Sequence, residues 1–261
     1  METAVEFVAI FVAGFWAGMI NVVVGSGTLV TFPTLLLFGY PPLVANISNN
    51  IGLVGGGISG TYGYRHELVG KRALLRSLLP ASVLGGTAGA LLLLVLPESA
   101  FKAIVPALIA AGLLMVVAGP AMQRRAARRR LGTDDGGTLS PRRLAAVVAG
   151  VFVLGIYGGY FGAAQGILVV GLLSVLTAES LQAITGVKNL LTTAVNAVAA
   201  ATFMIVAWDS VDWKLVALIA AGATLGGLAG ARFGRKLSPR LLRAMIVVVG
   251  TVAIVRMVFF D

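Results

Sequence analysis

Ten apolar segments, separated by short polar stretches, dominate this chain. They lie at about 5–24, 28–38, 43–63, 73–96, 101–119, 144–161, 165–177, 181–207, 214–231 and 244–260. Several reach the roughly 20 residues that an α-helix needs to cross a bilayer. Hydrophobic residues make up 58% of the chain and charged residues 11%, which is too apolar a composition for a surface in water. The pattern predicts an all-α, polytopic membrane protein.

The composition excludes several kinds of site. The chain has no cysteine, which rules out disulfides, cysteine metal sites and thiol nucleophiles. Its one histidine, His66, rules out a multi-histidine metal site within one chain. We therefore expect no metal, no other cofactor and no enzymatic activity. The N-terminal residues, METAVEF, lack the positive charge of a secretory signal, so we expect the first apolar segment to stay in the mature protein.

The net charge of +10 is concentrated in three polar stretches. Sixteen of the 20 lysines and arginines lie within 65–76, 124–143 and 232–243. Basic residues of membrane proteins collect in cytoplasmic loops, beside anionic lipid. We therefore expect the loops at 64–72, 120–143 and 232–243 in the cytoplasm and the protein in the inner (plasma) membrane of the cell. Nucleic acid is not an expected partner, because no polar fold presents these arginines.

The two halves of the chain look like copies of one unit. Gly18 and Gly25 fall 137 residues before Gly155 and Gly162, and the sequence GGTAGA at 85–90 falls 141 residues before GGLAGA at 226–231. Such self-similarity indicates duplication, which is common in transporters. We predict three units, namely a first transmembrane repeat at 1–122, a cytoplasmic arginine-rich linker at 123–143 and a second transmembrane repeat at 144–261.

The loop charges predict that the two repeats are inverted. Segment 73–96 would start in the cytoplasm, whereas its partner 214–231 would start outside, so each half needs an odd number of crossings. Segment 28–38 would measure only about 16 Å as a helix, roughly half a bilayer. We therefore expect each repeat to open with a broken, re-entrant helical hairpin, followed by three transmembrane helices. Two full crossings in place of the hairpin would give the same parity.

Lys188 is the most informative residue, because it lies inside segment 181–207 among apolar neighbours. A charge at that depth is costly unless it snorkels to the interface or faces a polar cavity. We expect the second arrangement, in which the ammonium attracts an anion. Lys188 and Asn189 match the positions of Asn49 and Asn50 in the first half. Amides buried in lipid need partners, which are either neighbouring helices or a ligand.

Each opening hairpin turns at small residues. The sequences Gly25-Ser26-Gly27-Thr28 and Gly162-Ala163-Ala164-Gln165 both lead into the N-terminus of the next segment. Free backbone N–H groups and the positive end of the helix dipole favour an anion at such a place, and close helix packing through glycine is the alternative. The candidate substrate-binding residues are Ser26, Thr28, Asn49, Asn50, Gln165, Lys188 and Asn189.

In their order and duplication, these elements resemble the sulfite exporter TauE/SafE family, also called the toluenesulfonate uptake permease family. The resemblance covers nearly the whole chain. It rests on the sequences at 25–42 (GSGTLVTFPTLLLFGYPP), 158–173 (GGYFGAAQGILVVGLL), 183–191 (AITGVKNLL) and 211–213 (VDW), together with Asn196. It implies export or uptake of small sulfur-containing anions such as sulfite, sulfoacetate or related organosulfonates.

We therefore predict a secondary transporter for a small sulfur-containing anion, working by alternating access around a site halfway through the membrane. Its expected partners are the anion, the bilayer and, as one option, a second copy of the chain in a homodimer. An anion channel would use a similar polar lining. An intramembrane serine hydrolase would need hydrogen-bond contact between Ser26 and His66, which the predicted depths of the two residues oppose.

Overall fold

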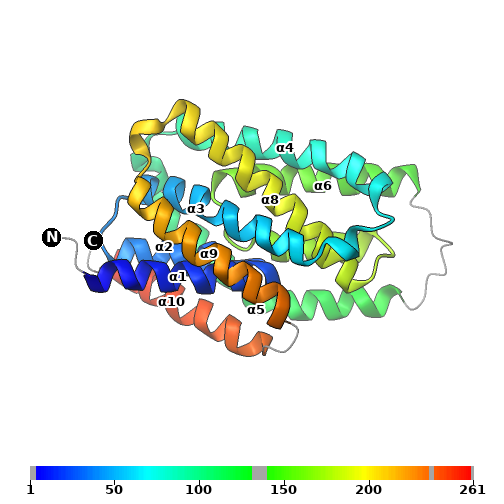
Figure 1. Ribbon diagram of the computed structural model, residues 1–261. Coiled ribbons are helices and arrows are strands. Elements are labelled where there is room, and N and C mark those ends of the chain that lie inside the picture. The colour runs from blue at the N-terminus through cyan, green and yellow to red at the C-terminus, as the bar shows by residue number, and fades with distance from the viewer. Residues whose placement is uncertain (1–3, 131–139, 235–237, 260–261) are drawn as a thin grey trace.

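The computed structural model describes residues 4–130, 140–234 and 238–259, which form ten α-helices and two 3₁₀-helices. The first half contains α1 (Ala4–Val23), α2 (Thr28–Leu37), α3 (Pro42–Gly63), η1 (Arg65–Leu68), α4 (Arg72–Val95) and α5 (Glu98–Arg130). The second half contains α6 (Pro141–Tyr160), α7 (Gln165–Leu176), α8 (Leu181–Val206), η2 (Trp208–Ser210), α9 (Trp213–Phe233) and α10 (Pro239–Phe259). The described residues include no strand, so the all-α prediction is confirmed (Figure 1).

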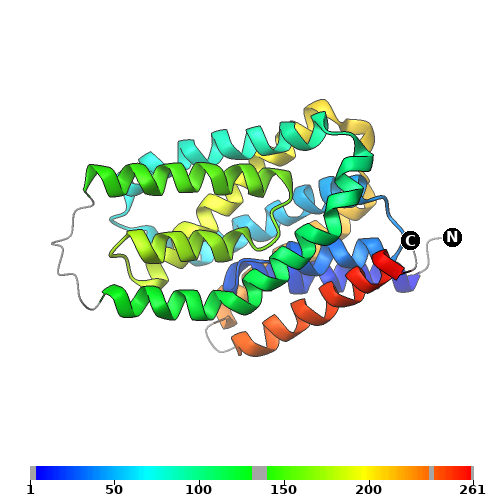
Figure 2. The same ribbon diagram turned by 180° about the vertical axis from the view of Figure 1, so that it is seen from behind.

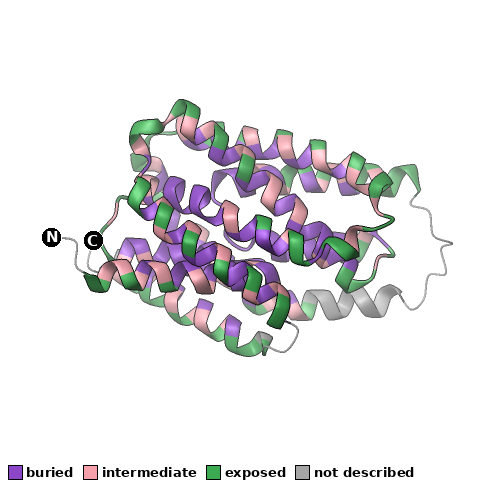
Figure 3. Ribbon diagram, in the orientation of Figure 1, coloured by how far each residue is buried: buried purple, intermediate pink, exposed green. Residues whose placement is uncertain are grey.

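Six helices are long and apolar enough to cross a bilayer, judged by length and composition. They are α1, α4, α5, α6, α8 and α9. Large apolar side chains lie exposed on the outside of the bundle, among them Leu84 at 63% and Val153 at 60% exposure. Figure 3 shows buried residues where helices face one another and exposed residues on the outward sides. An apolar outer surface of this extent indicates a lipid environment, and the prediction of a polytopic membrane protein is confirmed.

Two apolar helices are too short to cross. α2 has 10 residues and α7 has 12, which corresponds to about 15 and 18 Å of helix. A bilayer core measures roughly 30 Å. These lengths favour the re-entrant hairpins expected from the sequence, although the position of each hairpin in a membrane stays a prediction.

One expected boundary differs in the structure. α5 continues to Arg130 and α6 begins at Pro141, so the predicted linker at 123–143 is helical at both ends. Residues 131–139 of that linker lie outside the described part of the chain. Alanine, arginine and glutamine, which fill the end of α5, are good helix formers in water as well as beside lipid. The polar composition therefore marked the end of the apolar segment and not the end of the helix.

The two halves exchange helices. α4 of the first half packs along α6 of the second half, and α9 of the second half packs along α1 of the first half (Figures 1 and 2). These are the two most extensive helix pairs among the described residues. Neither half therefore buries its first helix by itself, and the halves fold as one body.

Glycines bring the exchanged helices into close contact. A Cβ atom at Gly89 of α4 would lie 2.0 Å from the Ile156 carbonyl oxygen of α6, and a Cβ at Gly226 of α9 would lie 1.8 Å from the Phe15 carbonyl oxygen of α1. The corresponding pairs in the other half are Gly230 with Met19 and Gly85 with Phe152. Each close approach in one half thus has a counterpart in the other, at positions related by the 137-residue and 141-residue offsets of the sequence repeat. These contacts support the predicted duplication, while the inverted orientation stays a prediction.

The close approach at Gly226 predicts a large stability difference between two glycine variants. Gly226→Ala places a methyl group against the α1 backbone and should lower the free energy of unfolding by about 1–3 kcal/mol. Gly171→Ala in α7, where an added Cβ meets nothing within 4 Å, should change it by less than about 0.5 kcal/mol. Thermal unfolding in detergent measures both, and equal melting temperatures for the two variants would contradict this packing.

Candidate functional site

The turn between α1 and α2 touches the turn between α6 and α7. The backbone N–H of Gly166, at the start of α7, donates to the carbonyl oxygen of Gly25 at 3.0 Å. A Cβ at Gly166 would lie 2.6 Å from the Gly25 Cα, so only glycine fits there. Gly25 also has a φ of +91° and Gly162 a φ of +75°, a conformation that glycine adopts without strain. The two interrupted helices of the two halves therefore meet inside the molecule.

Lys188 of α8 lies buried next to this contact. The residue is 1% exposed, and a Cβ at Gly166 would lie 3.0 Å from its Cδ. Its Nζ donates to the carbonyl oxygens of Asn21 at 2.7 Å and Val22 at 2.9 Å. A third hydrogen bond runs to Asn189 Oδ1 at 2.6 Å. The lysine does not snorkel to solvent. It caps the C-terminal end of α1, which is the negative end of that helix dipole.

These partners satisfy the hydrogens of Lys188 without neutralising its charge. All three partner atoms are oxygens that accept, so the three bonds use the three N–H groups of an ammonium. None of these three oxygens belongs to a carboxylate. A buried cation held by neutral oxygens still carries a large desolvation cost. An anion beside it would lower that cost.

Asn46 of α3 makes the related contact in the other half. Its Nδ2 donates to the carbonyl oxygen of Tyr160 at 3.0 Å, at the C-terminal end of α6. α8 thus caps the first helix of the first repeat, and α3 caps the first helix of the second repeat. Both caps cross between halves, so the C-terminal ends of the two interrupted helices are occupied by protein donors.

Two of the predicted substrate-binding residues hold helices together. Thr31 of α2 donates through its hydroxyl to Asn49 Oδ1 of α3. Gln165 donates through Nε2 to the carbonyl oxygen of Leu154 at 3.0 Å, which ties the start of α7 to α6. These bonds are the interhelical role considered for buried amides. Thr28, another predicted residue, is buried at the first position of α2.

Three of the predicted residues have buried polar atoms without a hydrogen-bond partner among the described residues. These atoms are Ser26 Oγ, Asn50 Oδ1 and Asn189 Nδ2. Ser26 is 1% exposed and Asn189 is 4% exposed. Leaving such an atom unpaired costs about 1–3 kcal/mol. α2 and α7 begin without a side-chain cap, and N–H groups of their first turns donate to backbone carbonyls, as Leu29 does to Ser26 and Gly166 to Gly25. The positive ends of both short helix dipoles nevertheless lie at the two turns.

Sequence reasoning missed several partners of this site. The carbonyls of Asn21 and Val22 carry no sequence signal, because every residue has one. Asn46 does carry a sequence signal, since it shares a helix face with Asn49 and Asn50 at the same spacing as Thr185, Lys188 and Asn189. A similar cap is formed by Arg256 of α10, which donates to the carbonyl oxygen of Leu37 at the end of α2.

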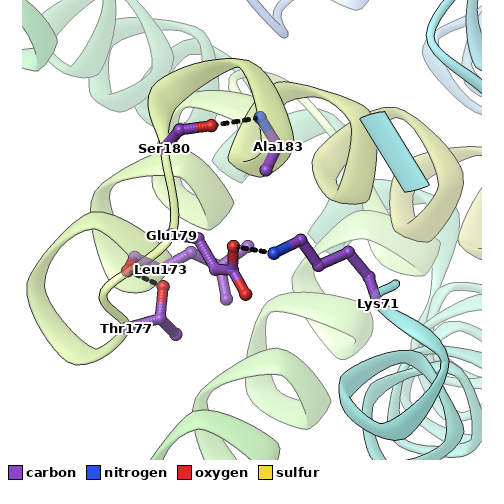
Figure 4. Close-up of polar contacts among 6 residues, drawn as sticks. All are labelled: Lys71, Leu173, Thr177, Glu179, Ser180 and Ala183. Atoms are coloured by element: carbon purple, nitrogen blue, oxygen red, sulfur yellow. Dashed lines mark hydrogen bonds and ion pairs between the residues drawn. The ribbon is translucent and has the colours of Figure 1, made fainter. Parts of the chain in front are cut away.

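The end of the molecule near η1 carries a separate polar group. Lys71, just before α4, forms an ion pair with Glu179 in the connection between α7 and α8. Figure 4 shows the two side chains pointing toward each other. In the same connection Ser180 caps α8 by accepting from the Ala183 N–H at 3.2 Å. His66 is exposed on η1, whereas Ser26 Oγ is buried and has no partner, so the two do not form a dyad.

The chain was compared with known proteins. The family model described as Sulfite exporter TauE/SafE matches residues 10–257. A "Probable membrane transporter protein" of Haemophilus influenzae is 28% identical over 99% of this chain and 97% of its own length. "Probable membrane transporter protein ORF9" of a Sinorhizobium species is 28% identical over 95% of this chain and 90% of its own. "Probable membrane transporter protein YfcA" of Escherichia coli K12 is 26% identical over 96% and 88%. No solved structure matches.

The hydrogen-bond pattern predicts opposite effects for two polar substitutions without added anion. Ser26→Ala removes an unpaired buried hydroxyl and should leave the melting temperature unchanged or raise it. Asn46→Ala breaks the cap on Tyr160 and should lower the free energy of unfolding by about 1–3 kcal/mol. Thermal unfolding in anion-free detergent buffer distinguishes them. A Ser26→Ala protein that melts as early as Asn46→Ala would mean that the hydroxyl has an internal partner.

Proposed function

This chain belongs to the sulfite exporter TauE/SafE family, and we propose that it is a secondary transporter for small sulfur-containing anions such as sulfite or organosulfonates. The family and the relatives named above make it a membrane transporter. The substrate class is our inference from the family description together with the charge and hydrogen-bond balance at the contact between the two turns. The observation that carries it is the buried, un-neutralised ammonium of Lys188.

The proposed anion site lies where the interrupted helices meet. Lys188 supplies the charge there, and the N-terminal ends of α2 and α7, which have no side-chain cap, supply a favourable dipole. Ser26 and Asn189 bring unpaired groups that can donate to sulfonate oxygens. A sulfonate or sulfite accepts several hydrogen bonds and is negative, so it matches this set. Half-helix N-termini holding an anion are a known arrangement in transporters.

The remaining predicted residues receive supporting roles in this proposal. Asn49 and Gln165 position the turns through their bonds to Thr31 and Leu154. Thr28 and Asn50 line the first-half side of the site, with Asn50 Oδ1 available to a donor. Substrate binding would therefore rest on Ser26, Lys188 and Asn189, with the other four residues shaping the site around them.

The exchange of helices between the repeats supports a mechanism of alternating access. We propose that the repeats are inverted and that the turn contact alternately faces each side as one helix group rocks against the other. The matched glycine contacts of α4 with α6 and of α9 with α1 support this relation. The basic residues near η1 would face the cytoplasm of a cell with this protein in its plasma membrane.

Removal of the buried charge tests the proposal. Lys188→Met should weaken binding of sulfite and methanesulfonate at least about tenfold, because one charge-assisted interaction is lost. Lys102→Gln on α5, which removes an exposed charge, should bind as the unchanged protein does. Anion-dependent thermal shift and saturable uptake into proteoliposomes measure the effect.

Lys188→Met also removes the cap on α1, so this variant can fold poorly. A second variant keeps the test decisive in that case. Asn189→Leu deletes an unpaired donor and the Asn189 bond of Lys188, and it leaves the Asn21 and Val22 bonds that cap α1 in place. It should fold and bind the same anions more weakly. Unchanged affinity in both variants would remove this site from the transport pathway, and single-channel currents in place of saturable flux would favour a channel.

A further inference from the structure

A cavity of about 170 Å³ lies beside Lys188, on the side of the molecule where α10 begins. Its walls come from the end of α1 and from α5, α7, α8 and α10. Figure 2 shows α5 crossing between α7 and α10 in this region. The lining includes Val24 and Ile167, next to the turn contact, and Arg243, near the start of α10. Figure 1 shows that α10 begins at the end of the bundle opposite the chain termini.

Two cations from different helices line this cavity. One is Lys188 of α8, and the other is Arg243 of α10, which is half-buried. Thr185 adds a hydroxyl, and no carboxylate is among the lining residues. An anion in this cavity would be attracted by both charges. The guanidinium of arginine also has a planar set of donors that matches a sulfonate or carboxylate.

The rest of the cavity wall is apolar. Val23, Val24, Val170 and Leu181 face it, together with Ile167 and Val116. A bare inorganic oxyanion would lose water where it meets these apolar side chains, because they offer it no hydrogen bond in exchange. An anion with a short hydrocarbon part would bury that part against them. The volume equals that of roughly five or six waters, which suits a body of a few carbon atoms.

We propose that this cavity is a binding compartment for a small amphiphilic organic anion and that Arg243 is its second cationic residue. The charged head faces Arg243 and Lys188, and the hydrocarbon part lies against the valine side chains of α1 and α7. The proposal rests on the anion-transport function above and adds two features to it, namely a named residue and a preference for anions that carry a short alkyl group.

A sulfonate series tests both features. The probes are sulfate, methanesulfonate and propane-1-sulfonate, and binding to the purified protein is measured by calorimetry. Propane-1-sulfonate should bind more tightly than methanesulfonate, and both more tightly than sulfate. Arg243→Gln should weaken propane-1-sulfonate about tenfold, as expected for one charge-assisted hydrogen bond. Arg240→Gln, an exposed arginine of the same helix, is the matched control and should have no effect.

The outcomes separate this proposal from the transport function. If the unchanged protein binds no sulfonate and transports none, the transport function itself fails. If it binds sulfonates but Arg243→Gln behaves as Arg240→Gln does, Arg243 is not part of the site. An affinity that does not rise with the alkyl chain would overturn the amphiphilic class and leave the anion site intact.

Cysteine labelling gives a readout that does not depend on transport or on substrate binding. The chain contains no cysteine, so Thr185→Cys introduces a single thiol at the cavity wall. A negatively charged sulfonatoethyl thiosulfonate should label it faster than the trimethylammonioethyl reagent of similar size. Arg243→Gln should reduce that rate ratio and Arg240→Gln should preserve it. A ratio that does not change in Arg243→Gln would contradict the placement of the guanidinium in this cavity.

Discussion

A helix that ends inside an apolar bundle exposes backbone groups that apolar side chains and lipid cannot satisfy, and the contacts between the two halves are arranged around this constraint. The C-terminal ends of α1 and α6 are satisfied by Lys188 and Asn46, each from the opposite half of the chain. The two turns also share a backbone hydrogen bond, in which the Gly166 N–H donates to the Gly25 carbonyl oxygen. The N-terminal ends of α2 and α7 have no side-chain cap, and the positive ends of their dipoles are the ends that we propose attract an anion.

The same constraint explains why the two halves depend on each other. α1 is buried largely by α9, and α6 by α4, with glycines that let the backbones approach. Without a hydrophobic driving force between helices in lipid, such close contacts and interhelical hydrogen bonds supply the association energy. Lys188 is then both a structural cap and the charge at the proposed site, so stability and anion recognition share one residue.

The sequence was sufficient to locate the helices, but it could not identify the hydrogen-bond partners that join them. Runs of apolar residues located the ten α-helices of the described residues, six of which are long and apolar enough to cross a bilayer. It misplaced the end of α5, since helix propensity continues through arginine and alanine after hydrophobicity stops. Burial of Lys188 followed from its apolar neighbours, but its acceptors at Asn21 and Val22 are main-chain atoms without a sequence signature. In the sequence, Asn49 and Gln165 were buried amides as plausible for substrate binding as Asn189. Only their hydrogen bonds to Thr31 and Leu154 show that they join helices. Arg243 belongs to the basic stretch 232–243, which is typical of a topology signal, so nothing in the sequence marked it as part of a site.

The central claim is that an anion occupies the contact between the two turns, next to Lys188. Crystals grown with saturating 2-bromoethanesulfonate would test it through the anomalous signal of bromine, which marks the ligand independently of the protein density. The account predicts a bromine peak beside the Gly25–Gly166 contact, with the sulfonate within hydrogen-bond distance of Ser26 or Asn189. A protein that binds the compound saturably but shows its bromine only at the outer surface, with Ser26 and Asn189 still unpaired, would contradict it.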